Sequence, residues 1–170
     1  MKSLFIKELL ETATHYENKV AFVDLGGSRS TTYGQLLDLA KQVSAYLRQE
    51  GVAPHSNVCI RMPDTMEFMA AEIGVWLTNC AAVPIGMNSP EERVRTIAQN
   101  CESALLIDEE VMYRVKGMSV SDAEEIVLPE STDDALIAYT SGSTGIPKGI
   151  IFTFEPFDRN YPHTFGLAAP

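Results

Sequence analysis

The run ALIAYTSGSTGIPKG, residues 135–149, is the most informative part of this sequence. Its first four residues, Ala135–Ala138, are apolar and indicate a buried strand. Hydroxylated residues and glycines follow, and then Lys148. Glycines let a backbone approach an anion, hydroxyl and amide hydrogens donate to it, and an ammonium group supplies charge. Because a second apolar segment, Ile150–Phe152, comes next, the run predicts a polyphosphate-binding loop between two strands.

This loop differs from the P-loop of ordinary nucleotide hydrolases, Gly-x4-Gly-Lys-Ser/Thr, in which the last hydroxyl holds magnesium. Here Pro147 precedes Lys148 and Gly149 follows it, and five residues separate Gly142 from Lys148. Composition alone would also fit a flexible Ser/Gly linker. The strand-like segments on both sides and the stiff proline favour the phosphate loop.

Three segments resemble one known family. Thr140–Gly149 resembles the signature loop of the adenylate-forming superfamily, which includes acyl-CoA synthetases, luciferases and the adenylation domains of nonribosomal peptide synthetases. Thr31–Leu36 (TTYGQL) and Val75–Ile85 (VWLTNCAAVPI) resemble the first and second core motifs, in the expected order. Tyr139 before the loop and Pro90–Val94 after the second motif resemble the corresponding residues of the amino-acid-activating branch of this superfamily. The resemblance covers most of the chain.

The resemblance implies that residues 1–170 form the N-terminal part of the large adenylation subdomain, with a phosphate-binding loop at residues 139–149. It also implies ATP and Mg²⁺ as cofactors. The reaction would join a carboxylic acid, here an amino acid, to AMP and pass it to the phosphopantetheine thiol of a carrier protein or to coenzyme A. Screening and positioning of phosphate charge are the main demands of that reaction. The residues implied to hold the β- and γ-phosphates are Thr140, Ser141, Gly142, Ser143, Thr144, Gly145 and Lys148.

The sequence departs from the family in ways that limit the expected activity. Thr153-Phe154 stands where family members usually have a Thr-His pair. The family's carboxylate pocket, adenine-reading loop, ribose aspartate and catalytic lysine all belong to segments after the equivalent of Pro170. The resemblance therefore assigns no catalytic residue to this chain. We expect the 170-residue chain to bind ATP weakly and to form no adenylate by itself.

Two other functions remain open. One is a non-catalytic or split interaction module, which would expose an apolar face where a complementary fragment packs. The other is a phosphate-binding protein of unrelated fold that has the same loop by chance. The order of the three motif segments disfavours the second of these.

Composition indicates one soluble globular domain. The chain has 170 residues, of which 45% are hydrophobic and 21% charged, and this length is enough to bury a core. A formal net charge of −10 disfavours nucleic acid and anionic membranes as partners, since both attract basic surfaces. The apolar stretch Phe68–Met87 is interrupted by polar residues and by Pro84, so no membrane span is expected.

Cysteine and histidine patterns predict no metal site. Cys59, Cys80 and Cys101 form no Cys-x-x-Cys pair and are expected to be small buried residues rather than metal ligands or disulfides. Together with charged residues where a signal peptide would need an apolar core, they favour the cytoplasm. The three histidines are isolated and are expected at the surface or in the core rather than in catalysis; they are His15, His55 and His163.

Apolar segments of strand length alternate with segments of helical periodicity, which predicts a layered α/β fold with a largely parallel sheet flanked by helices. Three helices are expected to begin at capping pairs: Thr32 with Gln35, Asp64 with Glu67, and Ser89 with Glu92. Residues 108–134 are interpreted as a solvated acidic connector, and residues 154–167 as a helix made irregular by two prolines.

Overall fold

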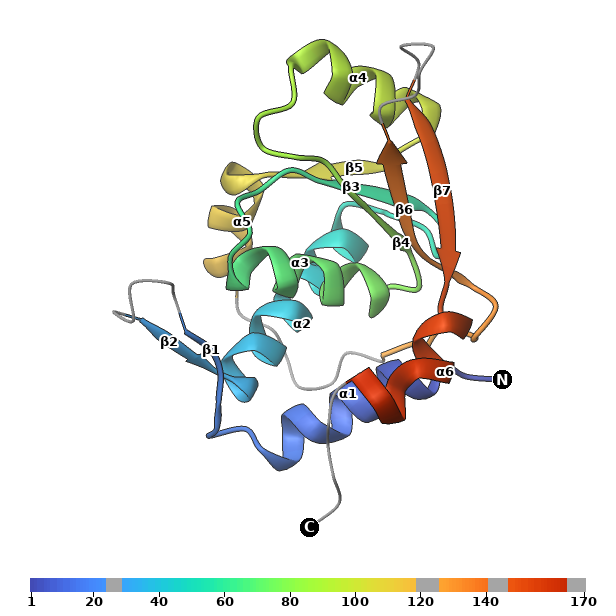
Figure 1. The fold of residues 1–170 in the computed structure, drawn as a ribbon. Coiled ribbons are helices and arrows are strands. Elements are labelled where there is room, and N and C mark those ends of the chain that lie inside the picture. The colour runs from blue at the N-terminus through green and yellow to red at the C-terminus, as the bar shows by residue number, and fades with distance from the viewer. Residues whose placement is uncertain (24–28, 119–125, 141–146, 165–170) are drawn as a thin grey trace.

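The computed structural model describes residues 1–23, 29–118, 126–140 and 147–164, without the side chains of residues 161–164. A five-stranded sheet in the order β5-β3-β4-β6-β7 lies at its centre, and a two-stranded hairpin, β1-β2, lies beside it (Figure 1). The strands are β1 Val20–Val23, β2 Ser30–Thr32, β3 Asn57–Ile60, β4 Ala81–Pro84, β5 Leu105–Ile107, β6 Asp134–Thr140 and β7 Lys148–Thr153. The helices are α1 Leu4–His15, α2 Tyr33–Gln49, α3 Met66–Trp76, α4 Glu91–Asn100, α5 Glu109–Lys116 and α6 Glu155–Thr164.

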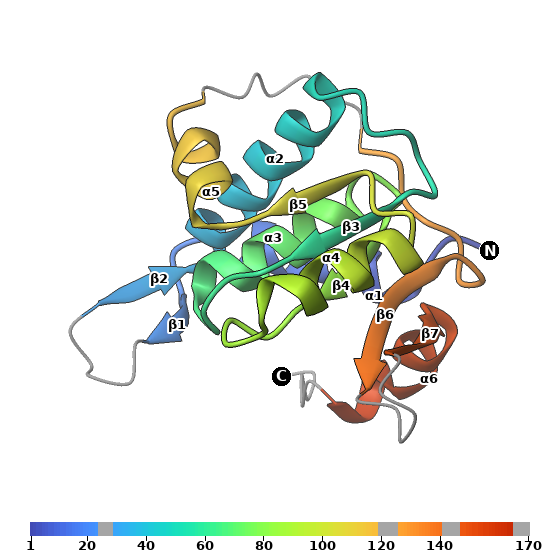
Figure 2. The ribbon, with the colours of Figure 1, turned by 90° about the horizontal axis from the view of Figure 1, so that it is seen from above.

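The sheet is layered between helices, as the sequence predicts. Strands β5, β3, β4 and β6 are parallel, and β7 pairs antiparallel with β6 at the edge. Helix α4 covers one face, while α2, α3 and α5 lie on the other (Figures 1 and 2). A parallel sheet needs such cover on both faces, because its strands are apolar throughout. The predicted layered α/β fold is confirmed.

Alternate residues of the strands belong to two apolar cores. Val58 and Ile60 of β3 pack into the larger core with α2 and α3, whereas Cys59 between them packs into the smaller core beneath α4. Ile137 of β6 joins the smaller core as well. This alternation follows from the two-residue period of a strand. Each core therefore depends on the register of the same strands.

Helices α2 and α3 approach each other closely at Gly74. A Cβ atom there would lie 2.5 Å from Cβ of Val43 and 2.7 Å from the carbonyl oxygen of Ala40. Both distances are far shorter than real Cβ contacts, so only glycine fits between these two backbones. Gly74 lies in α3 just before Val75–Ile85, and it therefore fixes how close the second motif segment lies to α2.

One of the three predicted caps is confirmed. The Thr32 hydroxyl accepts from the amide of Gln35 at 3.2 Å, and the Gln35 side chain accepts from the amide of Thr32 at 2.9 Å. The other two predictions are wrong by one residue. Helix α3 begins after Thr65, which makes no side-chain cap bond, and α4 begins after Pro90 rather than Ser89.

The interpretation of residues 108–134 as a connector is wrong for its first part. Residues 109–116 form helix α5, and the Asp108 carboxylate caps it by accepting from the amide of Val111 at 2.9 Å. Acidic residues in the first turn and basic residues in the last turn complement the helix dipole. The charge pattern is therefore that of a short capped helix with buried Met112 and Val115.

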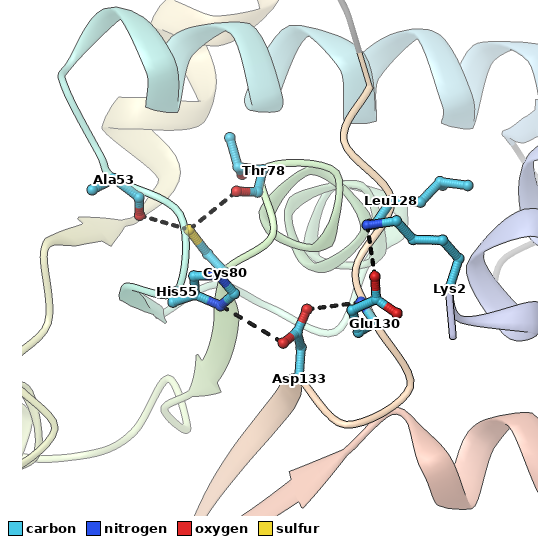
Figure 3. Close-up of polar contacts among 8 residues, drawn as sticks. All are labelled: Lys2, Ala53, His55, Thr78, Cys80, Leu128, Glu130 and Asp133. Carbon is cyan, nitrogen blue, oxygen red and sulfur yellow. Dashed lines mark hydrogen bonds and ion pairs between the residues drawn. The ribbon is translucent and has the colours of Figure 1, made fainter.

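Polar contacts secure the segment that enters β6. Asp133 accepts from the amide of Glu130 at 2.7 Å and lies 3.8 Å from Nδ1 of His55 (Figure 3). Lys2 donates to the carbonyl of Leu128 at 2.7 Å and pairs with Glu130 at 3.2 Å. These bonds fix the amino end of the strand whose other end leads to residues 141–147. His55 itself is exposed, as expected.

Helix α6 packs on α1 through a charged cap. The Asp158 carboxylate accepts from the Ser3 hydroxyl and from the amide of Phe5, both at 2.8 Å. Such a carboxylate at a helix N-terminus satisfies amides that the helix itself leaves unpaired. Helix α6 is helical throughout its described residues, Glu155–Thr164, so the expected irregularity is not observed there.

The cysteines are buried and free, as the sequence predicts. Cys59 and Cys101 lie with their Sγ atoms 3.8 Å apart, and burial raises the pKa of the Cys59 thiol to about 12. His15 is exposed and stacks edge-on against Tyr16, while the side chain of His163 lies outside the described part. None of the helices in the described ranges is long and apolar enough to cross a membrane.

Candidate functional site

The β6–β7 hairpin places the two described residues of the predicted phosphate site opposite each other. The antiparallel register pairs Thr140 with Lys148, and the next pair along is Tyr139 with Gly149. Side chains of a directly opposed pair lie on the same face of the sheet, roughly 5 Å apart at Cβ. Both Thr140 and Lys148 are exposed. A hydroxyl donor and an ammonium group therefore flank the start and the end of the same loop.

The other predicted site residues lie outside the part of the chain that the structure describes. They are Ser141, Gly142, Ser143, Thr144 and Gly145. Their place in the chain is nevertheless bounded, because the strand before them ends at Thr140 and the strand after them begins at Lys148. Residues 138–140 pair with residues 148–150 across the two strands, and we call these six residues the hairpin neck.

The neck lies at the carboxyl edge of the parallel sheet. Strands β3, β4 and β6 run in the same direction, so Ile60, Pro84 and Thr140 end at one edge. In open α/β sheets, ligands bind outside the carboxyl ends of the strands. The position of Thr140 and Lys148 thus fits a ligand-binding role, independently of the residue types in the loop.

A second cation, Arg61, lies at this edge and was not singled out from the sequence. It pairs with Glu91 of α4 at 2.5 Å and donates to the carbonyl of Ser89 at 3.1 Å. Its side chain is 22% exposed, so these partners rather than solvent hold the guanidinium. Arg61 therefore organises the turn between β4 and α4. A basic residue directly after a buried strand is the signal that could have identified it.

Tyr139 contacts two other parts of the site. Its hydroxyl donates to Oδ1 of Asn100, the last residue of α4. Its ring also lies close to Gly149, where a Cβ atom would be 3.0 Å from Cζ of Tyr139 and 3.0 Å from Cγ2 of Ile137. Burial raises the pKa of the Tyr139 hydroxyl, which therefore stays a hydrogen-bond donor at neutral pH.

The position that departs from the family motif belongs to the core. Phe154 is fully buried, and its ring lies 5.9 Å from Trp76 and 6.3 Å from Phe157. An imidazole there would need hydrogen-bond partners in an apolar setting. Phe154 thus joins α6 to the sheet, and Thr153-Phe154 supplies no titratable group to the site.

Comparison with known proteins identifies the family of this chain. The model of the family described as AMP-binding enzyme matches residues 9–161, which is most of the chain. The chain belongs to the AMP-binding enzyme family. Its curated relatives within that family include peptide synthetases: it is 35% identical to bacitracin synthase 1 of Bacillus licheniformis over 140 residues, and 30% identical to the hybrid PKS-NRPS synthetase traA of Penicillium crustosum over 157 residues.

Two solved structures have a similar fold. The N-terminal subdomain of NpsA from Klebsiella oxytoca superposes with a TM-score of 0.79 at 21% identity, covering 91% of this chain and 41% of that one. VinN in complex with 3-methylaspartate gives 0.81 at 18% identity, covering 97% and 52%. The chain spans only 3% of bacitracin synthase 1 and 4% of traA, although the matches cover 73% and 84% of this chain.

Proposed function

We propose that this chain is the N-terminal part of an adenylation domain. That domain would use ATP and Mg²⁺ to activate a carboxylic acid, in particular an amino acid, as an acyl-AMP for transfer to a phosphopantetheine thiol. A relative 28% identical over 155 residues is named delta-poly-L-ornithine synthetase, which supports an amino acid as the substrate class. Three free, buried thiols favour a reducing compartment such as the cytoplasm.

The observation that most supports this proposal is the opposition of Thr140 and Lys148 across the hairpin neck. Residues 139–149 would form the phosphate-binding loop, with hydroxyl and amide donors from Ser141, Gly142, Ser143, Thr144 and Gly145 and the charge from Lys148. In a chain of net charge −10, a polyanion needs such a local cation. Charge-assisted hydrogen bonds to phosphate oxygens are about twice as strong as neutral ones.

The residues present fit Mg²⁺ that is bound together with the nucleotide. Among the described residues, no group of three or more His, Cys, Asp or Glu side chains could hold a metal ion. Mg²⁺ keeps several waters and is commonly held by substrate phosphates with only one or two carboxylates. The described part of the chain would therefore bind the phosphates, which in turn hold the ion.

The variant Lys148→Ala should weaken MgATP binding by the 170-residue chain about tenfold or more, because a charged hydrogen bond contributes roughly 1.5–3 kcal/mol. Lys7→Ala removes the same charge from an exposed position on helix α1, where Lys7 pairs with Glu11 at 3.8 Å. We expect Lys7→Ala to bind MgATP as the wild type does. Isothermal titration or an NMR titration of both variants tests this.

Two results would refute the proposed function. One is equal affinity of Lys148→Ala and Lys7→Ala, since nonspecific attraction to positive charge would then explain the binding. The other is formation of an aminoacyl adenylate by the isolated chain with ATP, Mg²⁺ and amino acids, because the proposal assigns the catalytic lysine and the acid pocket to other segments.

A second candidate function, a split module that needs a complementary fragment, is favoured by the surface of β7. Ile150, Ile151 and Phe152 are 48%, 58% and 39% exposed, and β7 is the edge strand of the sheet. Adjacent strand residues point to opposite faces, so both faces of this edge are apolar. Exposed apolar edge strands favour pairing with another chain.

Sedimentation velocity over a range of concentrations distinguishes this candidate. Self-association that Ile151→Lys abolishes, and that an added complementary fragment relieves, would support a split module, because an edge charge opposes strand pairing. A monomer at every concentration would count against it. Because Ile150 and Ile151 are exposed on this edge strand, we expect the wild type to self-associate.

A further inference from the structure

One described side-chain hydrogen bond joins the hairpin neck to the rest of the fold, besides the packing of Tyr139 against the smaller core. Strand β6 pairs with β4 at Leu136 and Ala82, and Leu136 lies two residues before the neck. Beyond that point, the bond from the Tyr139 hydroxyl to Asn100 is the only side-chain hydrogen bond in the described residues that joins the neck to another element. Figure 1 shows the end of α4 beside the upper ends of β6 and β7.

The partner of Tyr139 belongs to a helix that is fixed at both ends. At its start, Glu91 pairs with Arg61, which follows β3. At its end, Nδ2 of Asn57 in β3 donates at 2.7 Å to the carbonyl oxygen of Cys101, the residue after Asn100. Both contacts connect α4 to β3, an interior strand of the sheet. The position of Asn100 is therefore fixed relative to the sheet, and a hydrogen bond to Asn100 fixes the neck relative to the sheet as well.

The ring of Tyr139 reaches across β7 because position 149 is a glycine. A Cβ atom there would approach the Tyr139 ring to 3.0 Å and its hydroxyl oxygen to 3.2 Å. Distances of 3.0–3.4 Å are tighter than nine in ten real Cβ contacts, so a larger residue at position 149 would require the Tyr139 ring to shift by a few tenths of an ångström. Gly149 immediately follows Lys148, and Tyr139 immediately precedes Thr140. Tyr139, which bonds to Asn100, is therefore next to Thr140 in the sequence, and Gly149, over which its ring packs, is next to Lys148.

We propose that Tyr139 is a positioning residue, whose bond to Asn100 and packing over Gly149 set the direction in which Thr140 and Lys148 face the triphosphate. This inference rests on the proposed function of the loop. Tyr139 itself lies on the opposite face of the strand from Thr140, so it acts through the neck and does not touch the nucleotide. Its role is to keep the two opposed side chains in one orientation.

The test compares MgATP affinities of the 170-residue chain with Tyr139→Phe, Asn100→Ala and the double variant. Each single variant removes one partner of the bond, and we expect each to weaken binding about three- to tenfold, the net effect of one hydrogen bond. The double variant should bind no more weakly than the singles, because they remove the same interaction. Tyr113→Phe is the matched control, since Tyr113 on α5 is 82% exposed, and its affinity should equal that of the wild type.

The outcomes separate this inference from the proposed function. If Tyr139→Phe lowers the melting temperature but the folded variant binds MgATP as the wild type does, Tyr139 has only a structural role and the inference is wrong. Additive losses in the double variant would also overturn it. If Lys148→Ala binds no more weakly than Lys7→Ala, the proposed function fails as well. A loss in Lys148→Ala together with unchanged Tyr139→Phe refutes the positioning role alone.

Discussion

Trp76→Ala should lower the free energy of unfolding by about 3–5 kcal/mol, the usual cost of removing a buried large aromatic side chain. Trp76 is 6% exposed and lies at the end of α3. Its ring meets Phe5 at 5.8 Å and Phe154 at 5.9 Å, both edge to face, and so joins α1 and the start of α6 to α3. Edge-to-face pairs contribute beyond the area that they bury.

The indole also orients the strand that leads to the site. Its Nε1 donates at 2.8 Å to the carbonyl of Ala135 in β6, so the variant leaves a buried acceptor without its partner. Trp76→Phe keeps a ring and should lose less. Tyr113→Ala is the control, because it removes an aromatic ring that is 82% exposed and should change stability little. Urea unfolding followed by circular dichroism measures all three, and a loss below about 1 kcal/mol for Trp76→Ala would contradict this packing account.

Glu72→Gln should stabilise the chain at pH 8 by on the order of 2 kcal/mol and change its stability little near pH 4.5. Burial in α3, with a smaller contribution from the charge of Asp64, raises the pKa of the Glu72 carboxyl from 4.5 to about 7. The folded state therefore holds the proton more tightly than the unfolded state. Stability is greatest below the unfolded pKa and is lost as the pH rises through about 7.

Urea unfolding at pH 4.5, 6 and 8 measures this difference. The gap between Glu72→Gln and the wild type should widen from the lowest pH to the highest and level off above the folded pKa. Glu11→Gln removes an equally charged but exposed side chain, 60% exposed in its pair with Lys7, and should show no such trend. A gap that is constant with pH would mean that the pKa of Glu72 is the same in the folded and unfolded chains, and would contradict this account.

Local patterns predicted the elements better than their ends. The pair Thr32 and Gln35 forms the expected capping box, whose two hydrogen bonds join residues only three apart in the sequence. At α3, by contrast, Glu67 pairs with Lys116 of α5 at 2.7 Å. At α4, Arg61 binds Glu91 and the carbonyl of Ser89. These partners lie 28 or more residues away in sequence, so no local pattern could reveal them.

Helix α5 was missed for a related reason. Its acidic start and basic end were interpreted as solvated charge, although Asp108 in front of Glu109 and Glu110 also matches a capped helix start. Only two apolar residues, Met112 and Val115, are fully buried, so the periodic signal was weak over eight residues. Helix propensity and capping were the better evidence in this segment.

The sequence indicated which residues belong to the candidate site, but not which contacts hold those residues in place. The loop composition and the flanking strands predicted a loop between two strands, and the structure adds that Thr140 and Lys148 are paired across the hairpin. Asn100 is 39 residues from Tyr139, and the bond between them forms only because α4 ends beside the hairpin. Contacts of this kind depend on the packing of the layers and have no sequence signature.

Under the proposed function, the hairpin binds the phosphates of ATP rather than its base. This can be tested with amide spectra of the isotope-labelled 170-residue chain, titrated separately with MgATP, magnesium tripolyphosphate and adenosine. We expect MgATP and magnesium tripolyphosphate to shift the same amides, in residues 139–149, and adenosine to leave them unchanged. Shifts produced by adenosine alone, or MgATP shifts confined to other parts of the chain, would contradict the claim.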